Sequence, residues 1–165
     1  MEAATPAWRA GVIRDFAASE LFERTFQEGM DLVEETAAYL DGAGRQDSKL
    51  LSRNAALAYA SESMRLTTRL MQVASWLLVQ RAVREGDMPP EAACQESYRV
   101  GAEKTLEAAE IAEIPRPLTD LLDRSERLYD RVRHLDRRMY IEAVSEEPAH
   151  PLQAQLERLR NAFGG

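Results

Sequence analysis

Apolar residues recur along most of the chain at steps of three and four, a spacing that gathers side chains on one face of an α-helix. Signals for β-strands are missing: no run alternates β-branched and polar residues, and no Asn-Gly or Asp-Gly turn joins two such runs. The pattern therefore predicts an all-α protein.

Four helices are expected from the apolar spacing and from the residues that interrupt it. The first spans residues 19–40, with Ser19 as its N-cap. The second is long, covering residues 48–84, and the stretch EGDMPP follows it. The third spans residues 91–113 and ends or kinks at IPRP, because a residue before proline avoids the helical conformation. The fourth spans residues 118–142.

These helices are expected to form an antiparallel three-helix bundle with a long central helix and a kinked third helix, plus a short C-terminal amphipathic tail helix. Residues 1–18 would be an N-terminal arm, residues 19–144 the bundle domain, and residues 145–165 a linker and tail. An apolar heptad marks the core face of the fourth helix (Leu118, Leu121, Ser125, Leu128, Val132, Leu135 and Met139).

The long helix carries two stripes. The first alternates steps of four and three over the whole length (Leu50, Asn54, Leu57, Ser61, Met64, Thr68, Met71, Ser75, Leu78 and Ala82). The second is confined to the C-terminal half (Leu66, Leu70, Val73 and Leu77). We expect the first stripe to be buried, with its polar residues setting the helix register as a buried polar position does in a coiled coil.

The C-terminal half of this helix is apolar on most of its faces and needs a cover. One possibility is a second copy of the chain across a two-fold axis, which predicts a homodimer interface at four residues (Met71, Trp76, Leu77 and Leu78). The alternative is that the N-terminal arm folds over the same surface within one chain, using its own apolar residues (Trp8, Val12, Ile13 and Phe16). We favour the second copy.

Composition narrows the class of protein. The chain has 165 residues, of which 45% are hydrophobic and 30% charged, as in a soluble globular protein. Its net charge of −7 disfavours nucleic acid as the main partner. The uncharged run Leu70 to Gln80 is shorter than the roughly 20 residues that span a bilayer. The first residues have no apolar run of the kind found in a signal peptide, and the single cysteine, Cys94, suits a reducing compartment, so we expect a cytoplasmic protein.

Reactive side chains are sparse. His134 stands among arginines on the exposed side of the fourth helix, and His150 has an E-x-x-H spacing that Pro148 and Pro151 prevent from being helical. Cys94 has no second cysteine or histidine near it in a recognisable motif. We therefore expect no catalytic residue, no metal and no cofactor. The alternative is a helical-bundle signalling or phosphotransfer protein that uses His134.

The C-terminal tail has its own apolar face. Four residues at steps of four, three and four lie on one side of a helix of about three turns (Leu152, Leu156, Leu159 and Phe163). Such a helix is too short to be stable alone in water. We expect it to bind a partner; the alternative is that it folds onto its own bundle.

Two long stretches carry a resemblance to a known family. They are ASELFERTFQEGMDLVEETAAYLDG, residues 18–42, and GRQDSKLLSRNAALAYASESMRLTTRLMQVASWLLVQRAVREG, residues 44–86. With them the chain resembles, over residues 18–143, the alphaproteobacterial regulator of CtrA degradation (RcdA) family of ClpXP protease adaptors.

The resemblance implies a homodimeric helical bundle without catalytic residues and with a mobile C-terminal tail. Members of this family bring protein substrates, such as cell-cycle transcription regulators, to a ClpXP protease primed by another adaptor. They do so partly through a further adaptor that binds cyclic di-GMP. From charge and hydropathy we expect no nucleic acid or membrane partner and a cytoplasmic location, with recruitment to a cell pole as a further expectation.

Overall fold

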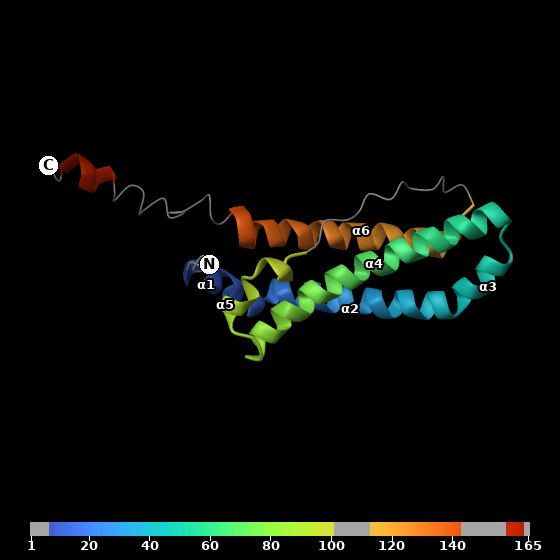
Figure 1. The fold of residues 1–165 in the computed structure, drawn as a ribbon, viewed down its shortest axis with the longest axis horizontal. Coiled ribbons are helices and arrows are strands. Elements are labelled where there is room, and N and C mark those ends of the chain that lie inside the picture. The colour runs from blue at the N-terminus through green and yellow to red at the C-terminus, as the bar shows by residue number, and fades with distance from the viewer. Residues whose placement is uncertain (1–6, 101–112, 143–157, 164–165) are drawn as a thin grey trace.

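The computed structural model describes residues 7–100, 113–142 and 158–163, and these residues form helices and turns with no strand (Figure 1). The predicted all-α class is therefore confirmed. Residues 158–163 are helical, and the other elements are α1 (Ala7–Ala17), α2 (Glu20–Asp41), α3 (Ala43–Lys49), α4 (Arg53–Arg84), α5 (Pro90–Ala93), a 3₁₀ turn (Glu96–Tyr98), α6 (Arg116–Arg137) and a π turn (Arg138–Glu142).

The three long helices α2, α4 and α6 make the bundle. Figure 1 shows that α4 and α6 run in the same direction and that α2 runs against both. Ser52, just before α4, lies 3.2 Å from Glu113, just before α6, and Trp76 of α4 contacts Asp136 near the end of α6. The prediction that neighbouring helices are antiparallel is therefore wrong for α4 and α6. These two helices are parallel, because the chain returns to the start of α4 before α6 begins.

Capping explains where α2 and α4 begin. The Ser19 hydroxyl accepts a hydrogen bond from the Phe22 amide at 3.1 Å, so α2 starts where the sequence predicts. The long helix starts at Arg53 instead of residue 48, because the Ser52 hydroxyl accepts from the Ala55 amide at 3.3 Å. The residues before this cap form the separate short helix α3.

The predicted helix over residues 91–113 is wrong where the structure describes it. Helix α5 ends at Ala93, whose carbonyl accepts a hydrogen bond from the Tyr140 hydroxyl at 2.6 Å. The Val100 amide donates to the Asp136 carboxylate instead of to a helical carbonyl. The side chains of Tyr140 and Asp136 thus form hydrogen bonds with backbone groups that would bond to each other within a continuous helix. Residues 101–112 lie outside the described part of the chain.

The core follows the predicted stripes on two helices. The α6 heptad is buried, with Leu135 half-buried and the other six positions below 5% exposed. The second stripe of α4 is also buried (Leu66, Leu70, Val73 and Leu77). α2 contributes a face of mixed size, including Phe22 and Leu32. A Cβ at Gly29 would lie 2.6 Å from Leu77 Cδ1, so α2 and α4 approach closely because this residue has none.

The N-terminal arm is the helix α1, and it lies over the C-terminal half of α4. Phe16 packs on Trp76 with ring centroids 5.7 Å apart, and Ile13 is fully buried. The sequence left two possible covers for this part of α4, a second copy or the N-terminal arm. Around Trp76 the cover is the arm of the same chain.

A buried carboxylate ties the end of α6 to this region. Asp136 is 1% exposed, accepts a hydrogen bond from Trp76 Nε1 at 3.0 Å and pairs with the Arg99 guanidinium at 3.1 Å. It also accepts from the Val100 amide. One side chain therefore joins α4, α6 and the segment after the 3₁₀ turn.

Asp136→Ala should destabilise the bundle by about 3 kcal/mol, because removing one partner leaves the Trp76 N–H and the Arg99 charge unpaired. Urea unfolding followed by circular dichroism measures the change. Asp130→Ala, at an exposed position of the same helix, is the control and should change stability by about 0.5 kcal/mol or less. Equal stability of the two variants would show that the carboxylate does not hold these elements together.

Candidate interaction surface

The first stripe of α4 lies on the outside of the bundle, contrary to the prediction that it is buried. Its large side chains are 64% exposed at Leu57, 71% at Met64, 65% at Met71 and 51% at Leu78. The small residues between them are exposed as well. We call this surface the α4 face (Asn54, Leu57, Ser61, Met64, Thr68, Met71, Ser75 and Leu78).

The α4 face carries no charge. Between Arg53 and Arg81 the only charged residues of α4 are Glu62, Arg65 and Arg69, and none of them is exposed. By contrast, the exposed positions of α6 are mostly charged. Charge in α4 thus points toward the bundle and apolar side chains point toward solvent, the reverse of the usual arrangement.

Hydrogen bonds to α6 hold the charged side of α4 inward. Arg69 Nη1 donates to the Ser125 hydroxyl at 2.8 Å and to the Leu122 carbonyl at 3.2 Å. Glu62 pairs with Arg65 at 3.5 Å along the same helix. Ser125, the one polar residue in the α6 heptad, is therefore the acceptor for a buried guanidinium. These contacts fix which side of α4 meets the bundle.

A groove borders the C-terminal half of the α4 face. Its volume is about 570 Å³, and it lies between α4 and the segment around the 3₁₀ turn. Thr68, Met71 and Ser75 belong to both the groove and the α4 face. The residues that line it are Thr68, Met71, Gln72, Ser75, Trp76, Val79, Ser97, Tyr98 and Arg99. The groove thus adjoins the α4 face and extends it toward the 3₁₀ turn as a concave surface.

Of the four residues predicted at a homodimer interface, the structure exposes Met71 and Leu78 and buries Trp76 and Leu77. The predicted interface is corrected at Trp76 and Leu77, because α1 covers Trp76 and α2 covers Leu77. The return of a large apolar residue every seven positions, from Leu57 to Leu78, is visible in the sequence, but its exposure is not, because an uncharged helical stripe is equally typical of a core.

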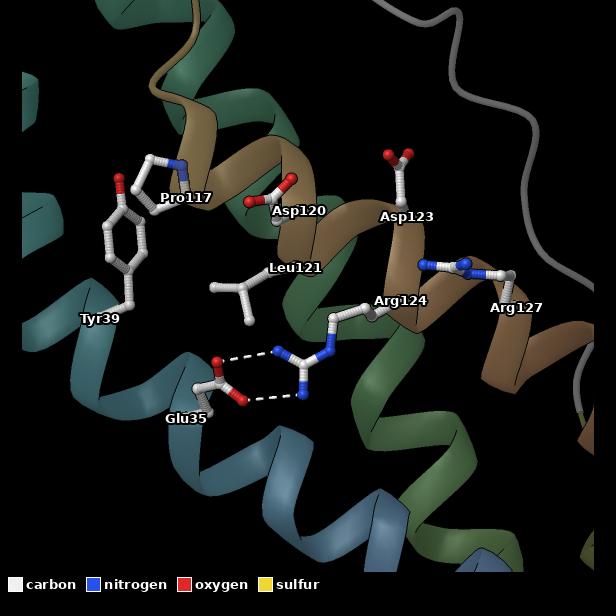
Figure 2. Close-up of a pocket in the computed structure, with 8 residues that line it drawn as sticks. All are labelled: Glu35, Tyr39, Pro117, Asp120, Leu121, Asp123, Arg124 and Arg127. Carbon is white, nitrogen blue, oxygen red and sulfur yellow. Dashed lines mark hydrogen bonds and ion pairs between the residues drawn. The ribbon is translucent and has the colours of Figure 1, made fainter.

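A second groove, of about 410 Å³, runs between α2 and α6 (Figure 2). Arg124 spans it and meets both oxygens of Glu35 at 2.8 Å; this hydrogen bonding lowers the pKa of Glu35. Seven residues further along α6, Arg131 pairs with one oxygen of Glu28 of α2. No serine, cysteine or histidine lines this groove, so it lacks the residues of a serine–histidine or cysteine–histidine pair. Its ion pairs join α2 to α6.

The titratable side chains singled out by the sequence form no reactive centre in the described ranges. His134 is exposed on α6, and Cys94 is buried, with its thiol donating to the Pro90 carbonyl. Burial raises the pKa of the Cys94 thiol, which opposes formation of a thiolate. Residues 7–100, 113–142 and 158–163 contain no group of three side chains suited to hold a metal ion. The phosphotransfer alternative for His134 stays a prediction.

The predicted partner-binding residues of the tail are described in part. Leu159 is 53% exposed and Phe163 is 85% exposed, one helical turn apart in residues 158–163. Leu152 and Leu156 lie outside the described residues. None of the described helices has the length and hydropathy that a membrane crossing requires.

The described structure is thus a helical bundle whose most distinctive surface is an uncharged apolar strip, the kind of surface by which proteins bind other proteins. Comparison with known proteins gives the family. Residues 13–163 match the family named protein of unknown function (DUF1465), and the chain belongs to this family.

A solved structure is closely similar. The crystal structure of RcdA from Caulobacter crescentus CB15 shares 74% sequence identity with this chain, with a TM-score of 0.66. The match covers 78% of this chain and 98% of that chain. It confirms the resemblance to the RcdA family that the sequence suggested. Among curated proteins none matches.

Two neighbouring leucines separate folding from surface binding. Leu77→Asp should destabilise the bundle by about 3 kcal/mol or more, or give insoluble protein, because it places a charge in the core. Leu78→Asp, on the α4 face, should change the unfolding free energy by about 0.5 kcal/mol or less. Urea unfolding of both variants against the wild type tests this. A destabilised Leu78→Asp protein, or a Leu77→Asp protein of normal stability, would contradict the orientation of α4.

Proposed function

We propose that this protein is a non-enzymatic adaptor that binds substrates and companion adaptors and delivers them to the ClpXP protease for regulated degradation. The observation that carries the proposal is the 74% identity with RcdA over 98% of the solved chain. At that identity most surface positions are shared as well as the core. The role resembles the control of CtrA turnover in the bacterial cell cycle, and the clients would be transcription regulators.

The surface chemistry supports a binding role. An adaptor must contact a client and a protease complex at once, and it needs no reactive residue of its own. This chain offers two apolar surfaces, the α4 face and the tail, although 30% of its residues are charged. Exposed apolar strips of this kind commonly mark sites of protein–protein contact.

We assign the α4 face to self-association. A homodimer would cover Met71 and Leu78, the two exposed members of the predicted interface, together with the rest of the strip. The face has no charge, so a second copy could cover it without leaving a charged group buried and unpaired.

We assign the tail to a client, a companion adaptor or the protease. Leu159 and Phe163 are uncovered in the structure, which supports a helix that docks elsewhere over one that folds onto its own bundle. Leu152 and Leu156 would extend the same apolar side by steps of four and three. The site of action would be the cytoplasm, including a cell pole to which the protease complex is recruited.

A reconstituted degradation reaction tests the proposal. It contains ATP, ClpXP, the priming adaptor and a CtrA-type transcription regulator as client. The full chain should raise the rate of client loss, and a chain truncated after Val144 should raise it less while keeping the wild-type thermal midpoint. The tail variant Phe163→Asp should resemble the truncation, and Asn161→Asp, which adds the same charge beside it, should resemble the full chain.

The outcomes separate the two parts of the proposal. If the full chain leaves the rate unchanged with every client, and does not associate with ATP-loaded protease in a cytoplasmic extract, the adaptor role fails. If the truncated chain delivers every client normally, or if it unfolds, the tail is dispensable or structural and its assignment fails.

A further inference from the structure

Two stripes of exposed residues run side by side along α2 and α6. In both helices the members recur at steps of three and four, so each stripe lies on one side of its helix. The α2 stripe borders the groove from one side and the α6 stripe borders it from the other, as Figure 2 shows for Glu35 and Arg124. The members are Leu21, Arg24, Glu28, Asp31 and Glu35 on α2, and Arg124, Arg127, Arg131, His134 and Arg138 on α6.

Two ion pairs set the register of the stripes. Arg124 pairs with Glu35 at 2.8 Å, and Arg131 pairs with Glu28. In each pair the two residue numbers add to 159, as expected for two antiparallel helices that keep one register. Each further pair of positions with this sum therefore lies at one level along the groove.

This register leads to a level without an acidic residue on α2. One heptad beyond the second ion pair, Leu21 of α2 lies level with Arg138 of α6. Leu21 is 54% exposed, and Arg138 forms no ion pair with the side chains that the structure describes. One turn before this level, Arg24 of α2 comes beside the turn of α6 that holds His134. We call these four residues the open end (Leu21, Arg24, His134 and Arg138).

The positive charge of the open end is weakly balanced within the described part of the chain. There, only Glu20 pairs with Arg24, at 3.7 Å, and the two side chains are 84% and 78% exposed. Water screens an ion pair as exposed as this one, so Arg24 stays available to another carboxylate. The acidic side of α2 thus meets the basic side of α6 at one end of the groove, whereas arginine and leucine meet the basic side at the other.

We propose that the open end is a docking site for an acidic segment of a partner protein. The segment places carboxylates on Arg24 and Arg138, where α2 supplies none, and an apolar side chain on Leu21. The open end is separate from the α4 face and from the tail. It therefore adds a third contact surface and rests on neither of the two assignments made above.

A groove leads along α6 toward the open end. Its volume is about 460 Å³, and three arginines face two carboxylates among the residues that line it (Glu28, Arg124, Arg127, Asp130 and Arg131). Arg131 precedes Arg138 by one heptad, or about 10 Å at 1.5 Å per residue. A partner segment of about two helical turns can therefore lie in the groove and reach the open end.

A carboxylate-bearing protein segment fits the open end better than a nucleic acid does. Binding to a phosphate backbone takes many cations in a row, whereas this site has two arginines in a chain of net charge −7. The exposed Leu21 side chain has no counterpart on a phosphate backbone. A guanidinium can bind a carboxylate through two parallel contacts, as Arg124 does with both oxygens of Glu35.

A peptide-binding assay with the full chain tests the proposal. The probe is a fluorescein-labelled helical peptide of about 16 residues, long enough to form a helix, with glutamates and leucines on one side. A second probe has lysine in place of each glutamate. Fluorescence anisotropy should show binding of the glutamate probe alone. Because the contacts are ionic, raising NaCl from about 50 mM to about 300 mM should weaken this binding several-fold.

Charge reversal at the open end should reverse the preference between the probes. The double variant Arg24→Glu with Arg138→Glu should bind the glutamate probe roughly tenfold more weakly and should bind the lysine probe. Leu21→Ser should weaken the glutamate probe several-fold without changing its salt dependence. The control, Arg45→Glu with Arg133→Glu, makes the same change in net charge on α3 and on another side of α6, and it should leave the affinity within about twofold. All these positions are exposed, so each variant should keep the wild-type thermal midpoint.

Three results would overturn the proposal. They are equal binding of the glutamate probe by the open-end variant and the wild type, an equal loss in the control variant, and no binding by the wild type up to about 1 mM probe. A single-stranded DNA of the same charge that displaces the probe at a lower concentration would assign the site to phosphates and overturn it as well. The assay contains neither ClpXP nor a client, so its failure leaves delivery untouched.

Discussion

The orientation of α4 depends on the buried guanidinium of Arg69. It donates to the Ser125 hydroxyl and the Leu122 carbonyl of α6, at 2.8 Å and 3.2 Å, and is only 2% exposed. Turning α4 about its axis to bury Met64 would pull Arg69 from these acceptors, and a buried charge without partners costs several kcal/mol. The same turn would bring Leu70 and its neighbours in the second stripe into water. The apolar α4 face is therefore exposed to solvent because the hydrogen bonds of Arg69 hold the opposite side of α4 against α6.

Polar contacts join α6 to each of the other two long helices. Near the C-terminus of α4, Trp76 donates to Asp136 of α6 and packs against Phe16 of α1. On the opposite side of the bundle, ion pairs from Arg124 and Arg131 join α6 to α2. Each long helix thus has polar contacts that fix its rotation as well as apolar contacts that hold it. A bundle made in this way can present an apolar surface to partners without turning it into its own core.

The sequence predicted those elements whose local signals agree. Ser19 caps α2 as expected, and the α6 heptad is buried because its apolar positions have one face and one set of neighbours. For α4 the spacing alone could not show which stripe meets the bundle, since both have the period of a helix. That choice depends on Arg69 finding acceptors on a helix more than 50 residues away in the chain. The end of α5 was missed for a similar reason, because Tyr140 takes the carbonyl of Ala93.

The central claim is that an apolar, uncharged side of α4 is open for association and contributes nothing to the fold of one chain. Sedimentation velocity of the wild type and of Met64→Glu, over concentrations up to about 1 mM as a small interface requires, tests it most directly. The wild type should pass from monomer to dimer as concentration rises, whereas Met64→Glu should stay monomeric with an unchanged thermal midpoint. A wild type that is monomeric throughout, or a Met64→Glu protein that loses its fold, would contradict the account.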